Sequence, residues 1–85
     1  MFFNKRNKRK IAKMKKEIAE NYQDIIWDVE MVIENWKAQE ELAREKFEGS
    51  DLIARVAKIR ENIEVLEVHR DFLKRIAFDL YEVEV

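Results

Sequence analysis

Residues 51–82 have the sequence DLIARVAKIRENIEVLEVHRDFLKRIAFDLYE, and this stretch decides the fold. Apolar side chains recur in it every seven residues, and a second series fills the alternating positions. The first series is Leu52, Ile59, Leu66, Leu73 and Leu80, and the second is Val56, Ile63, Arg70 and Ala77. Spacings of four and three residues in alternation are typical of helices that pack as in a coiled coil. The stretch therefore predicts one long helix whose seam packs against another helix.

The other helix is predicted on the N-terminal side of a single break at Gly49. Gly49 can adopt the left-handed conformation that closes a helix, and Ser50 or Asp51 can cap the next one. No other strong breaker interrupts the chain. We therefore expect an all-α fold, an antiparallel two-helix hairpin with helices at about residues 7–47 and 51–82 and coiled-coil-like packing.

An apolar stripe in the first helix matches the seam of the second. It consists of Ile11, Met14, Ile18, Tyr22, Ile25, Val29, Val32, Trp36, Ala43 and Phe47. Ile26 and Ile33 widen this stripe, as in a globular helix. Asn21 is the weakest point, and a kink there would release a third short helix at the N-terminus.

Folding back at the turn sets the two helices in a definite register. Residues whose numbers add up to about 99 lie side by side, so Trp36 meets Ile63, and Glu40 lies beside Arg60. Arg70 interrupts the seam, and Asp28 is the nearest acidic candidate to pair with it. We interpret this arginine as a paired or snorkelling side chain that fixes the register, with anion binding as the alternative.

Charge divides the chain into a basic arm or helix extension, residues 1–16, and a hairpin domain, residues 17–85. The first 16 residues carry eight basic side chains and no acidic one. Since the whole chain has a formal net charge of −1, residues 17–85 are left with −9. In the predicted register the basic segment extends beyond the end of the second helix.

Three interpretations of the basic segment stay open. Its side chains could bind a polyanion or an acidic partner, and nucleic acid is one such polyanion. The segment could meet a membrane surface, with Phe2 and Phe3 inserted among the lipids; we rank this below nucleic acid. It could also be solvated, or dock on the acidic body of a second subunit. The candidate contact residues are Lys5, Arg6, Lys8, Arg9, Lys10 and Lys13.

Helical periodicity places further apolar side chains on the outward faces of the hairpin. These candidate interface residues are Trp27, Met31, Leu42, Val65, Val68, Phe72 and Ile76. Exposed together they would form an unusually large apolar patch. We expect burial in a homodimer or a higher oligomer; cover by residues 1–20 folded back, or a different protein partner, are the alternatives.

The chain lacks the residues and motifs that catalysis or metal binding would require. The chain has no Cys and no Thr, and its one Gly cannot form a phosphate-binding loop. A helical di-metal site needs Glu three residues before His69, where the chain has Leu66. We expect no enzyme activity, cofactor, metal or small-molecule substrate, and a cytoplasmic location. The leading hypothesis is a small interaction or regulatory protein that binds another macromolecule through an oligomeric hairpin surface; the alternative is a nucleic-acid-binding protein.

Overall fold

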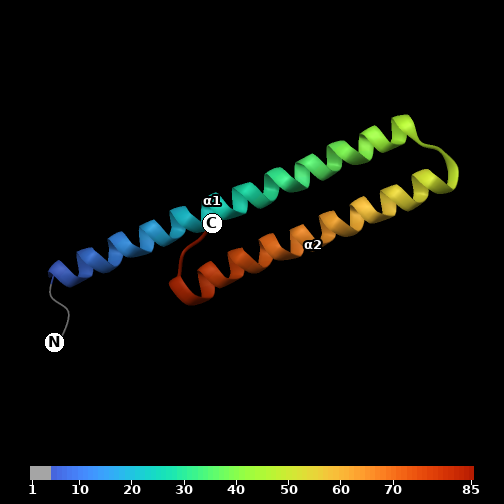
Figure 1. The fold of residues 1–85 in the computed structure, drawn as a ribbon. Helices are drawn as coiled ribbons and strands as arrows, with labels where there is room; N and C mark the ends of the chain where they lie inside the picture. Colours follow the sequence, from blue (N-terminus) through green and yellow to red (C-terminus); the bar gives the residue numbers. More distant parts are fainter. Residues whose placement is uncertain (1–4) are drawn as a thin grey trace.

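The computed structural model describes the backbone of residues 5–85 and the side chains of residues 7–85. Within this range the chain forms two helices, α1 (Lys5–Lys46) and α2 (Gly49–Tyr81), and no strand. The helices pack antiparallel along the length of α2 (Figure 1). The predicted all-α hairpin is confirmed, with each helix starting two residues earlier and ending one residue earlier than expected.

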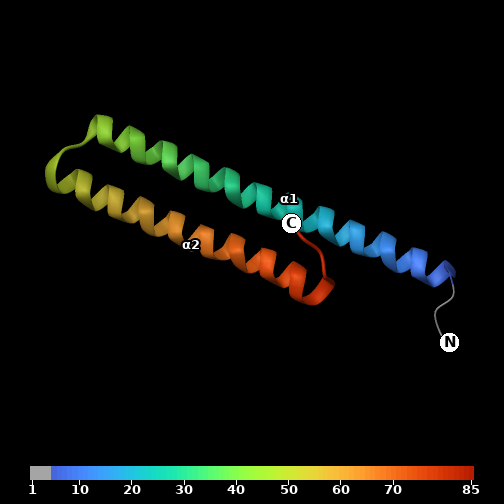
Figure 2. The same ribbon diagram turned by 180° about the vertical axis from the view of Figure 1, so that it is seen from behind.

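No kink divides α1. The helix runs without interruption through Asn21 (Figures 1 and 2), so a separate third helix, and cover of the outward faces by residues 1–20, are wrong. Asparagine costs a helix interior less than about 0.7 kcal/mol relative to alanine, and the turns on both sides contain good helix formers. One such residue without a proline does not end a helix of this length.

The turn depends on Gly49, whose φ is +62°. Phe47 and Glu48 join the helices, and Glu48, in an extended conformation, is the N-cap residue of α2. Its side chain makes no capping hydrogen bond. The expectation that Ser50 or Asp51 caps α2 is wrong because the helix begins before both; Asp51 instead lies in the first turn, where a negative charge is favourable.

Six apolar residues are buried between the helices, three from each. They are Ile26, Ile33, Ala43, Val56, Ile59 and Ala77. The predicted seam of α2 faces α1 at Val56, Ile59 and Ala77, and its members Leu52, Ile63, Leu66 and Leu73 are half-buried. Leu80, in the last turn of α2, was expected in this seam but is 69% exposed.

The buried stripe of α1 is rotated from the predicted one. Ile26 and Ile33, expected only at its margin, are the most buried side chains of α1, whereas Ile25 and Val32 remain 47% and 44% exposed. The buried and half-buried positions 22, 26, 29, 33 and 36 repeat the alternating spacing of α2. One stripe of α1 therefore faces α2, and a second apolar stripe beside it faces solvent.

The single hairpin is a long and thin molecule. Its extents are 69 × 17 × 10 Å, and its radius of gyration is 19.6 Å, against about 12 Å for a compact domain of this length. The accessible surface of 7220 Å² is about a third larger than the roughly 5400 Å² expected for a compact monomer of this mass. Neither described helix is both long and apolar enough to cross a membrane.

The first prediction tests the turn. Gly49→Ala should lower the free energy of unfolding by about 1 kcal/mol, because a left-handed backbone costs an L-residue that much. Nothing lies within 4 Å of the position that the new Cβ would take, so steric contact adds no further cost. Urea unfolding at fixed protein concentration measures the difference. Ser50→Ala is the control, and an equal loss in both variants would contradict this role of Gly49.

A second prediction concerns the ion pair across the helices. The Arg60 Nε atom donates to the Glu40 Oε1 atom at 2.9 Å, as the register predicts, and the Arg44 Nη2 atom lies 3.6 Å from the Glu40 Oε2 atom. The hydrogen bond from Arg60, aided by the charges of Arg60 and Arg44, holds the pKa of Glu40 below its ordinary value of 4.5, although partial burial opposes this. The stabilisation is therefore present above that value and disappears as the pH falls through the lowered pKa.

Arg60→Met should consequently lower the melting temperature at pH 7, and the difference from the unchanged protein should shrink on acidification below about pH 4. Thermal melts followed by circular dichroism across this pH range provide the measurement. Lys58→Met is the control, because Lys58 pairs only with Glu61 on its own helix. A difference for Arg60→Met that does not change with pH would show that packing, rather than the ion pair, is lost.

Candidate interaction surfaces

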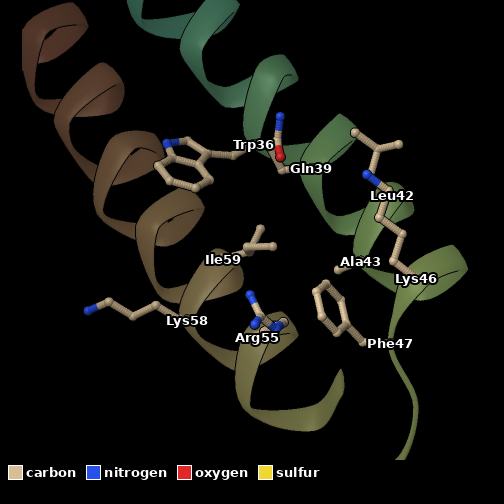
Figure 3. Close-up of a pocket in the computed structure, with 9 residues that line it drawn as sticks. All are labelled: Trp36, Gln39, Leu42, Ala43, Lys46, Phe47, Arg55, Lys58 and Ile59. Carbon is tan, nitrogen blue, oxygen red and sulfur yellow. The ribbon is translucent and has the colours of Figure 1, made fainter. Parts of the chain in front are cut away.

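One side of the hairpin has a groove near the turn, with a volume of about 410 Å³ (Figure 3). Both helices line it, with the residues Trp36, Gln39, Leu42, Ala43, Lys46, Phe47, Arg55, Lys58 and Ile59. The Arg55 guanidinium lies over the Phe47 ring, 3.8 Å from its centre. This cation–π contact covers the end of the core where the chain turns.

The positions of this groove identify an apolar surface farther along the same side. Residues seven apart face the same way in helices packed as a coiled coil. Seven-residue steps from Gln39 along α1 meet only apolar residues, whereas steps from Leu42 pass through Asn35, Asp28 and Asn21 to Met14. Along α2, steps from Arg55 and Lys58 reach Val65, Phe72 and Ile76, with Asn62, His69 and Asp79 at the remaining positions. We call this surface the apolar side; its members are Ile11, Met14, Ile18, Ile25, Val32, Leu42, Val65, Phe72 and Ile76. All are exposed except Ile18 and Ile76, which are half-buried.

The opposite side of the hairpin is mainly charged. A groove of about 470 Å³ opens on it, lined by Trp27, Glu30, Met31, Ile33, Glu34, Lys37 and Arg70. A smaller groove on the same side is lined by Arg44, Leu52, Ile53, Val56, Ala57 and Arg60. We call this the charged side. Seven-residue steps from Ala57 place Phe78 there as well, so this side is not free of large apolar residues.

Trp27 and Met31 stand out within the charged side. Trp27 is 60% exposed and Met31 is exposed beside it. Across the same groove, the Lys37 Nζ atom lies 3.3 Å from the Glu34 Oε1 atom, which gives the groove a charged rim. The arrangement combines an aromatic anchor, a flexible thioether and ionic groups, the combination found where proteins bind other proteins.

Arg70 does not pair with Asp28, as the sequence suggested. Its Nε atom donates to the Asp71 Oδ1 atom at 3.1 Å, and its Nη2 atom lies 4.0 Å from the Glu67 Oε2 atom. Asp28 shares its helical position with Leu42 and therefore lies toward the apolar side, away from the groove that Arg70 lines. Arg70 forms its ion pairs within α2, where the acidic neighbours are close in sequence.

The structure separates the interface residues that the sequence predicts. Leu42, Val65, Phe72 and Ile76 lie on the apolar side, whereas Trp27 and Met31 line the groove on the charged side. Val68 is exposed on the outer edge of α2. They therefore form two surfaces rather than one.

Five members of the apolar side were not predicted as surface residues, because the sequence pattern assigned them to the core stripe. They are Met14 and four residues spaced seven apart, Ile11, Ile18, Ile25 and Val32. The signal that could have separated them is the paired run at Ile25 and Ile26, and again at Val32 and Ile33. A helix that has adjacent apolar residues in successive heptads has two stripes, and only one of them can face a single partner helix.

The described part of the basic segment, from residue 5 onward, projects beyond the end of α2 (Figures 1 and 2). Lys15 marks the boundary, because its Nζ atom lies 3.4 Å from the Glu82 Oε2 atom, just after α2 ends. The candidate contact residues Lys8, Arg9, Lys10 and Lys13 are exposed. The side chains of Lys5 and Arg6 lie outside the described residues, and so do the structures of Phe2 and Phe3.

Residues 7–85 contain no cluster of His, Asp or Glu side chains that could hold a metal ion. His69 is exposed, on the helical position that it shares with Arg55 and Ile76. Searches of protein-family models, of curated proteins and of solved structures found no match to this chain.

Proposed function

We propose that the protein is a small, non-enzymatic interaction protein of regulatory type, which self-associates as a homodimer and binds another protein through its helical surface. The observation that carries the proposal is the exposure of large apolar side chains on both sides of a hairpin whose core is small. Such residues are costly to leave in water over a contiguous area, and they mark surfaces that bind a partner. The proposal includes a cytoplasmic location, with which a cysteine-free chain is compatible.

The small core supports self-association. No large side chain of the described residues is fully buried, and the core consists of six residues along a hairpin 69 Å long. Small helical domains of this kind gain stability when a second domain covers their remaining apolar stripes. A hairpin that dimerises on its apolar side would still leave the groove of the charged side accessible.

That groove is the better candidate for a different protein. Trp27 and Met31 offer an apolar anchor between ionic neighbours, and Trp residues dominate the binding energy of many interfaces. The groove runs along α1, as does the kind of groove that receives an amphipathic helix of a partner. We therefore assign partner binding to the Trp27 groove and self-association to the apolar side.

The third prediction tests this assignment. Trp27→Ala should reduce capture of the bound protein from a nuclease-treated lysate by about tenfold, the effect of losing roughly 1.4 kcal/mol at a binding hot spot. Quantitative mass spectrometry of the captured proteins gives the measurement. Phe78→Ala is the matched control, because Phe78 is also an exposed aromatic residue but lies outside the groove. Equal capture by both variants, or capture of nucleic acid alone, would contradict the assignment.

The alternative function is nucleic-acid binding, and the projecting basic segment is the observation that favours it. An exposed helix with lysine and arginine on several faces can neutralise several phosphates of a duplex or a single strand. No aromatic side chain is interleaved with these charges in residues 7–16, so the segment offers phosphate contacts without base stacking.

The fourth prediction concerns this segment. Deletion of residues 1–10 removes five basic side chains but keeps Ile11, Met14 and Ile18, so the melting temperature should change by only a few degrees. If the segment binds a polyanion, affinity for a generic duplex should fall and lose most of its salt dependence. Loss of folding on truncation would show a structural role. Unchanged folding and unchanged duplex binding would exclude a binding role for these charges.

A further inference from the structure

We propose that the apolar side takes a second copy of this chain in one particular orientation. The two copies run antiparallel with α1 packed against α1, and the two-fold axis crosses α1 between Asn21 and Tyr22. Because Lys15 lies beside Glu82 in the hairpin, this axis is level with the last turns of α2, and the two α2 helices meet only there. The inference deepens the proposed function and rests on its self-association part; binding of a different protein at Trp27 is a separate matter.

The choice of side follows from composition. On the apolar side, residues 11–32 of α1 present five large apolar residues, with Asp28 as the one charged residue. The groove on the charged side is lined by Glu30, Glu34 and Lys37. Packing the charged side against its own copy would desolvate these ionic groups at a cost of several kcal/mol, whereas the apolar side buries mainly apolar surface and one carboxylate.

The position of the axis follows from the spacing on α1. Ile11, Ile18, Ile25 and Val32 lie at equal intervals, and their midpoint falls between Asn21 and Tyr22. An antiparallel copy centred there sets Ile11 against the second copy's Val32, and Ile18 against its Ile25. Each β-branched residue meets another, which is the self-complementarity that a two-fold contact requires.

The antiparallel orientation follows from the projecting end of α1. Ile11 and Met14 lie beyond the end of α2 and carry apolar surface that the chain's own hairpin does not reach. In a parallel dimer, α1 would face the second copy's α2, which ends at the same level, so both residues would remain in water. In the antiparallel dimer, the second copy's α1 continues alongside them.

Charge favours the same orientation. Residues 5–16 are basic without an acid, whereas residues 17–36 contain six acidic residues and no basic one. The proposed contact lays residues 5–16 beside residues 27–38 of the second copy, whose net charge is −2. A parallel dimer would place two basic segments side by side, which repel each other within a Debye length of about 8–10 Å.

Single cysteines test the orientation, because the natural chain contains none. Asn21 and Asn35 are both exposed and share the helical position of Leu42, two heptads apart. In the proposed dimer the two Asn21 side chains lie next to the axis, while the two Asn35 residues are about 40 Å apart along it. On mild oxidation, Asn21→Cys should form a disulfide-linked dimer roughly tenfold faster than Asn35→Cys, because the thiols are held at high effective concentration.

A mixture of the single variants Ile11→Cys and Val32→Cys should likewise cross-link one to the other, and neither should link to itself. Equal rates for Asn21→Cys and Asn35→Cys, or a faster rate for Asn35→Cys, would overturn the proposed orientation. A monomeric mass by light scattering at micromolar concentration would overturn the dimer itself. Both results leave the capture experiment with Trp27→Ala unaffected, so the two proposals fail separately.

A pair of isoleucines tests the side independently. Ile25→Glu places an unpaired charge opposite Ile18 of the second copy, and should convert the dimer to a monomer while circular dichroism still reports helix. Ile53→Glu makes the same change at an exposed residue of the charged side, and should leave the dimer intact. If Ile53→Glu dissociates the dimer and Ile25→Glu does not, the contact lies on the other side.

Discussion

A helix that packs against one other helix can bury only one stripe of its surface, and this constraint governs the whole molecule. In α1 the buried stripe runs through Ile26 and Ile33, and in α2 through Val56, Ile59 and Ala77. The chain supplies more apolar residues than these stripes hold. The remaining apolar residues lie on the outside, because a hairpin buries only the stripes between its two helices. The proposed self-association and protein binding both follow from these exposed apolar residues.

The sequence predicted the fold well because the decisive signals are local. The seam from Leu52 to Ala77 has one clear period, and a lone glycine interrupts two helices that contain no proline. Register also followed from the short turn, as the pairing of Glu40 with Arg60 shows. These features depend on spacing along the chain, which is visible without coordinates.

The buried face of α1 was less predictable, because two apolar stripes lie side by side there. Ile25 and Ile26 are equally apolar, and only the rotation of α1 against α2 decides which is buried. Two smaller features of α2 were not predicted, for a similar reason. Leu80 keeps the seven-residue spacing but is exposed in the last turn, and Arg70 pairs with near neighbours rather than with an acid across the groove. These outcomes depend on the local geometry at helix ends and side chains, which a periodic pattern does not encode.

Self-association and nucleic-acid binding would both involve the positive charges of the basic segment. In the proposed dimer, residues 5–16 lie near acidic side chains of the second copy, so part of their positive field is neutralised before a polyanion arrives. The apolar residues of this segment, Ile11 and Met14, face the second copy, whereas Lys10 and Lys13 lie at helical positions that point away from it. A nucleic acid would therefore meet a basic stripe held rigid by the dimer rather than a free arm. Self-association and polyanion binding are compatible on this geometry, since the first uses one face of the segment and the second uses the other.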